Sequence, residues 1–130
     1  MTIVREAMVS DPRALEASAT AQDAAELLVR PDVRTVLVVE GERLVGCVTE
    51  RTLVERVVAA GRDPRGTTLA EIAEPVTLTV GPDAPVDDAY RLMEAEDVER
   101  LPVTDGPRLV GVLSRSALQR RLAEDEPQPS

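Results

Sequence analysis

Hydroxyl and guanidinium side chains follow two aliphatic runs of the sequence, at positions where an anion could bind. Thr49 and Arg51 come after the first run, and Ser114, Arg115 and Ser116 come after the second. Each group lies where an expected strand gives way to an expected helix, so backbone amides and the positive end of the helix dipole favour an anion there. The alternative is a local role, in which the hydroxyls cap the helices and the arginines are solvated.

The chain offers few residues for other chemistry. Histidine is absent, which removes the commonest general base and metal ligand. The single cysteine, Cys47, lies among valines and a glycine and is expected to be a small buried hydrophobe. Asp87 and Asp88 fall in an expected first helical turn, where acids favour the dipole, so they indicate no metal site. We expect no catalytic residues, no metal and no required cofactor.

Composition narrows the class of partner. The 130 residues carry a net charge of −9, and all 15 basic residues are arginine. An acidic surface repels phosphate backbones, and Tyr90 is the only aromatic residue, so nucleic-acid binding is not expected. No run of 18 apolar residues and no charged-then-apolar leader is present, which predicts a cytoplasmic protein without membrane contact.

An internal repeat organises the elements that position these side chains. A shift of 65 residues pairs 54 positions without a gap, from Val4/Leu69 to Val57/Leu122, and 15 of them are identical. Composition alone would give roughly four or five identities. We therefore predict a first repeat at 1–63, a linker at 64–68, a second repeat at 69–124 and a flexible tail at 125–130.

Each repeat has the signals of a βαββα unit. In the second, a β-prone segment at 77–80 precedes a helix that starts near Pro85, with an apolar stripe of Val86, Ala89, Tyr90 and Met93. In the first, Thr20 and Asp23 form a plausible capping box. Two apolar runs around a glycine then predict a β-hairpin in each repeat: 36–39 with 44–48, and 101–103 with 109–113. A last helix begins near Glu50 or Arg115, and Gly61 is expected to end the first of them.

These elements predict a mixed α/β fold of two repeats related by pseudo-two-fold symmetry, with their sheets packed on each other. A unit of about 60 residues is marginally stable alone, so the copies are expected to cover each other and leave clefts where they meet. The terminal helices carry Leu53, Val57, Val54 and Val58, opposite Leu118 and Leu122, and we expect this apolar face to be poorly covered within the chain.

The second hairpin and the helix after it, 98–103 and 105–118, resemble the CBS domain, and 48–53 is the counterpart in the first repeat. Two copies in register resemble a stand-alone CBS-domain pair, or Bateman module. The resemblance implies a non-catalytic regulatory module that binds AMP, ADP, ATP or S-adenosylmethionine, and a homodimer formed through the repeat-terminal helices.

The resemblance also implies roles for particular residues. Thr49 and Ser114 match the hydroxyl that contacts phosphate or ribose, whereas the ribose-binding aspartate is replaced by Thr52 and Ala117. Arg100 lies where family members often direct a basic residue toward phosphates, and Arg34 lies one position earlier in the register of the first repeat. Either arginine could instead pair with a carboxylate. The adenine would be held by residues around the first and second strands of each repeat, namely Val36, Leu37, Thr79, Val80, Leu101 and Pro102.

Two functions remain open. The first is a sensing module, in which an adenosine-containing or other anionic molecule binds between the repeats and signals to a separate, unknown effector protein. The second is a ligand-free CBS scaffold that acts as a dimeric interaction module. The missing aspartates favour the scaffold, whereas Arg100, Thr49 and Ser114 favour the sensor.

Overall fold

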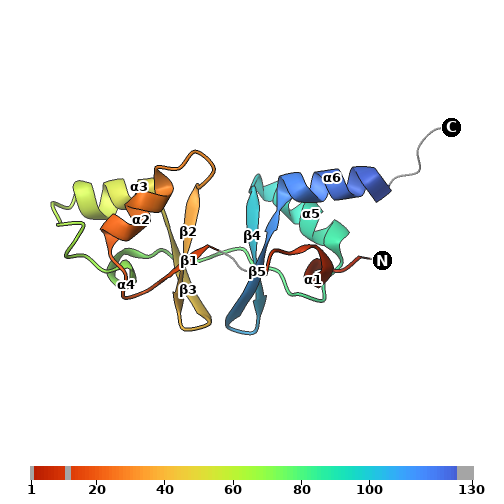
Figure 1. Ribbon diagram of the computed structural model, residues 1–130, viewed down its shortest axis with the longest axis horizontal. Helices are drawn as coiled ribbons and strands as arrows, with labels where there is room; N and C mark the ends of the chain where they lie inside the picture. The colour runs from red at the N-terminus through yellow and green to blue at the C-terminus, as the bar shows by residue number, and fades with distance from the viewer. Residues whose placement is uncertain (1, 11–12, 126–130) are drawn as a thin grey trace. The chain divides into compact units, whose positions relative to one another are not determined.

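The computed structural model describes residues 2–10 and 13–125, which form two compact units (Figure 1). The first unit lies within residues 13–77, and the second consists of described residues within 1–12 and 78–130. Both units combine helices and strands, so the predicted mixed α/β class is confirmed. Residues 126–130 of the predicted tail lie outside the described residues.

Three strands form the sheet of the first unit. β1 (Ala14–Glu16) runs parallel to β2 (Thr35–Glu40), and β2 forms an antiparallel hairpin with β3 (Arg43–Thr49). The hairpin turn contains Gly41, whose φ of +63° is a left-handed conformation that glycine adopts without steric cost. The predicted hairpin is confirmed, and each strand extends one residue beyond its apolar run at both ends.

Helices lie to one side of these strands (Figure 1). They are α2 (Ala21–Leu28), α3 (Glu50–Leu53), its π-helical continuation η1 (Val54–Val58) and α4 (Leu69–Ile72). The predicted capping box of α2 is present, because the Asp23 amide donates to Thr20 Oγ1 at 3.2 Å and the Thr20 amide donates to Asp23 Oδ2 at 3.1 Å. Gly61, with a φ of +71°, follows η1 as predicted.

The second unit repeats this arrangement with fewer strands. Its elements are α1 (Val4–Ala7), α5 (Val86–Glu96), β4 (Arg100–Asp105), β5 (Arg108–Ser114) and α6 (Arg115–Asp125). β4 and β5 form the second predicted hairpin, with Gly106 at its turn. α5 begins directly after Pro85 and is followed by its C-cap residue Asp97, which has a left-handed φ of +52°.

The strand predicted at 77–80 is reduced to one residue. Val80 makes an isolated parallel bridge to Val103, and its amide donates to the carbonyl of Pro102 at 3.1 Å. The ladder stops there because prolines stand beside it and have no N–H to donate. Pro82 is one of them, at the position equivalent to Ala17, whose amide bonds the Val39 carbonyl at 2.8 Å in the first unit.

Each compact unit contains the short helix that begins the other sequence repeat. α1, from the first repeat, belongs to the second unit, where Val9 and Val112 exchange backbone hydrogen bonds of 2.9 and 3.0 Å. α4, from the second repeat, belongs to the first unit, where Cys47 and Glu74 exchange two of 2.9 Å. The compact units therefore divide the chain differently from the predicted boundaries at 63 and 69.

Burial explains this exchange. Leu69 and Ile72 of α4 are fully buried in the core of the first unit, and Val4 of α1 is fully buried in the core of the second. Because an aliphatic side chain gains about 1.5–3 kcal/mol on burial, these short helices are held by packing rather than by their own length.

The terminal helices are better covered than the sequence predicts. Val57 and Leu118 are 3% and 2% exposed and belong to the cores of their own units, and Leu53 packs against the first core. The prediction that this apolar face is uncovered is therefore wrong for these residues, because they point into their own units. Val54 and Val58 do remain exposed, at 56% and 72%.

Candidate functional site

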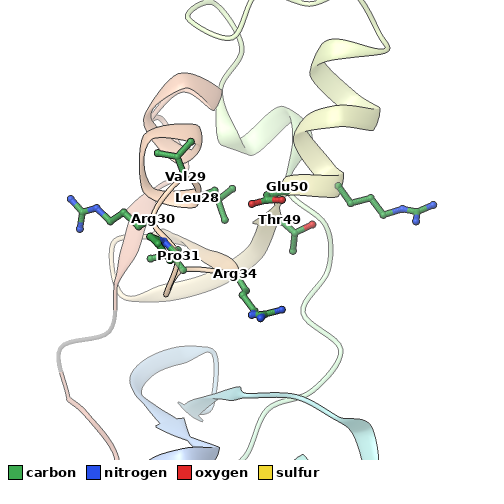
Figure 2. A pocket seen from close by; sticks show the side chains of 9 residues that line it. Leu28, Val29, Arg30, Pro31, Arg34, Thr49 and Glu50 are labelled. Carbon is green, nitrogen blue, oxygen red and sulfur yellow. The ribbon is translucent and has the colours of Figure 1, made fainter.

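A surface pocket of about 460 Å³ lies in the first unit. It is formed between the loop that follows α2 and the junction of β3 with α3. Figure 2 shows Thr49 and Glu50 at that junction and Arg30, Pro31 and Arg34 on the loop. The lining residues are Leu28, Val29, Arg30, Pro31, Val33, Arg34, Thr49, Glu50 and Arg51.

The junction is fixed by a second capping box. Thr49 is the N-cap residue of α3, and its Oγ1 accepts from the Thr52 amide at 3.3 Å. Thr52 Oγ1 accepts in return from the Thr49 amide at 3.0 Å and lies 3.1 Å from Thr49 Oγ1. This reciprocal pair satisfies amides that the start of a helix leaves without partners. The capping role considered for Thr49 is therefore present, while its side chain still lines the pocket.

The pocket carries more positive than negative charge. Its lining has three guanidinium groups and the single carboxylate of Glu50. Arg51 is bonded to Glu55 on the next helical turn, at 2.7 Å. Arg30 and Arg34 are exposed and make no ion pair within the part of the chain that the structure describes. Two cations are therefore available to an anion at this pocket.

Three of the six first-repeat site residues meet at this pocket: Arg34, Thr49 and Arg51. Val36, Leu37 and Thr52 are buried and do not line it. The sequence reasoning missed the loop residues Val29, Arg30 and Pro31, because they belong to no repeated motif. The basic residue and the proline directly after the apolar stripe of α2 are the signal that could have identified this loop.

The second repeat arranges the corresponding residues differently. Arg115 Nη1 lies 3.2 Å from Asp97 Oδ1 and donates to the Met93 carbonyl at 3.5 Å, and its Nε lies 3.6 Å from Glu99 Oε2. The Ser116 amide donates to Glu99 Oε1 at 3.2 Å. Hydrogen bonds from the Ser116 side chain and backbone, with the charges of Arg115 and Arg100, hold the pKa of Glu99 below its usual range despite some desolvation.

The other second-repeat site residues are spread between core and surface. Leu101 and Pro102 are buried in β4, Val80 is half-buried, and Thr79 and Arg100 are exposed. The half-buried Ser114 accepts from the Ala117 amide at 3.4 Å, and its hydroxyl lies 3.2 Å from that of Ser116. Ser114 therefore caps α6 weakly, without the reciprocal bond that Thr52 supplies in the first repeat.

Cys47 is half-buried, not fully buried as predicted, because it lies on β3 beside Glu74. Burial, and then the charge of Glu74, raise the pKa of its thiol, so the reactive thiolate is disfavoured. Among the described residues, no group of three or more Cys, Asp or Glu side chains is placed to hold a metal ion. No helix formed by these residues is long and apolar enough to cross a membrane.

Comparison with protein-family models identifies the family to which the chain belongs. The CBS domain matches at residues 4–59 and again at 67–124, which together cover most of the chain. The chain therefore belongs to the CBS-domain family and carries the domain twice. The predicted CBS-domain pair is confirmed.

Individual relatives agree with this placement. The chain is 31% identical over 114 residues to the CBS domain-containing protein YhcV of Bacillus subtilis (strain 168), covering 88% of this chain and 81% of that protein. A crystal structure of Hypoxic Response Protein I with two coordinated zinc ions is 29% identical, with a TM-score of 0.76 over 93% of this chain and 99% of that one. A crystal structure of CBSX2 in complex with AMP is 26% identical, with a TM-score of 0.74 over 94% and 96%.

Proposed function

We propose that this chain is a non-catalytic sensing module that binds an adenosine-containing anion in the first-unit pocket and signals to a separate effector protein. The observation that carries the proposal is that Arg30 and Arg34 line the same pocket as the hydroxyl-bearing Thr49. Neither arginine has an ion-pair partner among the described residues. The AMP complex of CBSX2 supports the adenosine part of the ligand, since that protein has a similar fold and sequence.

The charge of the pocket favours nucleotides over S-adenosylmethionine. Arg30 and Arg34 attract phosphates, and Arg51 adds a third positive charge that is partly neutralised by Glu55. S-adenosylmethionine carries a sulfonium, an ammonium and one carboxylate group, and its net positive charge is repelled by these guanidinium groups. We therefore expect affinity to rise from AMP to ADP to ATP, because each added phosphate adds charge that the two arginines can pair with.

Isothermal titration calorimetry and thermal shift test this function. We expect binding of AMP, ADP and ATP, weaker binding of S-adenosylmethionine, and a gain of about 2.7 kcal/mol in the free energy of unfolding at 100 times the dissociation constant. Arg34→Ala is expected to weaken ATP more than AMP. Arg65→Ala, which removes an equal charge outside the pocket lining, is the control. If none of these ligands binds at millimolar concentration, the sensing function is refuted.

A ligand-free scaffold is the second candidate, and the exposed valines of η1 favour it. Val54 and Val58 are large hydrophobic residues that are 56% and 72% exposed on one short helix, which is suited to contact with a second copy. In this alternative the chain forms a homodimer through η1 and binds other proteins without a nucleotide. The two candidates are distinguished by the titrations described above, since only the sensor responds to nucleotides.

A further inference from the structure

We propose that nucleotide binding is confined to the first repeat, because the second repeat holds its own Glu99 carboxylate where the first repeat presents Arg34. This inference rests on the proposed sensing function. It adds that the chain binds one nucleotide rather than two, and that Arg34 and Glu99 decide which repeat is competent.

Two equivalent positions carry opposite charges in the two repeats. The 65-residue offset pairs Arg34 with Glu99, and it pairs Glu50 with Arg115. The remaining arginines of the pocket have uncharged counterparts, with Arg30 paired to Ala95 and Arg51 to Ser116. Val29 and Pro31 are paired with Glu94 and Glu96, so where the first repeat has three guanidinium groups and one carboxylate, the second has one guanidinium group and three carboxylates.

The second repeat uses its charges internally. Glu99 accepts the Ser116 amide at 3.2 Å through one carboxylate oxygen, and its other oxygen lies 3.6 Å from Arg115 Nε. The Glu99 backbone carbonyl also accepts from the Arg115 amide, at 2.8 Å. Arg115 reaches Asp97 as well, and its side chain is only 27% exposed. The Ser116 amide and the Arg115 guanidinium are therefore already bonded to carboxylates of this unit, whereas the exposed Arg100 makes no ion pair among the described residues.

The first repeat has the opposite balance. An anion beside Arg34 and Arg30 gains charge-assisted bonds without displacing an ion pair, since neither guanidinium has one among the described residues. An anion at the second repeat must instead displace Glu99, which carries the same sign of charge. Like-charge repulsion and the loss of the existing bonds both oppose binding there.

ATP titrated into the wild-type chain, with AMP and ADP in parallel, tests the proposal. Calorimetry should give one ATP per chain. Amide resonances should shift at the non-proline residues of 29–34 and at Thr49–Arg51, and stay unchanged at Ser114–Ser116. Arg34→Glu should weaken ATP binding by at least about 30-fold and leave no second site. Arg65→Glu, with the same change of net charge outside the pocket, should bind within about threefold of wild type.

Each other outcome overturns the inference in a recognisable way. Two ATP molecules per chain, or ATP binding to Arg34→Glu that shifts the Ser116 amide, would show that the second repeat is competent, while the sensing function would stand. Absence of binding by AMP, ADP and ATP to the wild-type chain would remove the sensing function, and this inference with it.

Discussion

The hydroxyl of Thr52 accepts a hydrogen bond from the backbone amide of Thr49 at 3.0 Å. The resemblance to the CBS domain matches Thr52 to the ribose-binding aspartate of that family. The side chain is fully buried and its bond closes the capping box of α3. Thr52 therefore acts within the protein, and its hydroxyl has a partner before any ligand arrives.

Removing that hydroxyl should destabilise the fold. Thr52→Val keeps the shape of the side chain but leaves the Thr49 amide without its acceptor, so we expect a loss of about 1–2 kcal/mol in the free energy of unfolding. Urea denaturation measures it. Thr35→Val, at an exposed position of β2, should change stability by less than about 0.5 kcal/mol. Equal effects of the two changes would contradict the capping role.

Ligand selection by the ribose should be weak for the same reason. A carboxylate bonded to the ribose hydroxyls contributes about 1.5–3 kcal/mol per bond, and neither Thr52 nor Ala117 can supply it. We expect ATP and 2′-deoxy-ATP to bind with dissociation constants within about threefold of each other. Competitive calorimetry compares them, and a preference of more than about tenfold for ATP would show that another group reads the ribose.

Close packing of glycines against the exchanged segments gives a third prediction. A Cβ at Gly46 would lie 2.8 Å from Ala73 Cβ and 2.9 Å from the Glu74 carbonyl oxygen. Gly46→Ala should therefore cost about 1–3 kcal/mol, because the α4 segment has to move. Gly81→Ala is the matched control, since a Cβ there meets nothing within 4 Å. Thermal unfolding that is unchanged in Gly46→Ala would mean that this segment is loosely held.

The Glu99 network predicts a pH dependence of stability. The folded-state pKa of Glu99 is lowered, chiefly by hydrogen bonding to Ser116, so its ionised form stabilises the fold. That contribution is complete above the unfolded-state pKa of about 4.3 and is lost as pH falls through the lower folded-state value. Glu99→Gln should be less stable than wild type at pH 7, and the difference should shrink below pH of about 4. A difference that is constant with pH would argue against the network.

The exposed valines of η1 predict self-association. We expect light scattering after size exclusion to give a dimer at micromolar concentration, and Val58→Asp to give a monomer because a charge would be buried at the contact. Val9→Ser replaces another exposed valine, in the second unit, and should leave the mass unchanged. A monomeric wild-type chain at this concentration would refute the proposed homodimer through η1.

Local signals in the sequence predicted the local structure well. The two hairpins, the Thr20–Asp23 capping box and the left-handed glycines depend on neighbouring residues, so their positions could be read from the chain. The prediction of a strand at 77–80 failed because the length of that strand depends on Pro82 and Pro102. Their missing N–H groups matter only once the pairing of Val80 with Val103 is known.

Long-range packing limited the rest. The inward orientation of Val57 and Leu118 depends on which core lies beneath each helix, and periodicity alone does not show that. The same is true of the pocket: its loop residues Val29–Pro31 are brought opposite Thr49 by the fold, 18 or more residues away along the chain. Thr49 and Arg51 were predicted because a repeated strand-to-helix pattern marks their surroundings, and Arg34 was predicted from the resemblance to the CBS domain.

Neither half of this chain contains all the side chains that fill one interior. Leu69 and Ile72 complete the interior built mainly by the first half, and Val4 completes the other. A chain that held only one repeat would lack the short helix that completes its core, and only a second copy could supply that helix. Because one chain carries both repeats, each core is completed within the same molecule and does not depend on protein concentration.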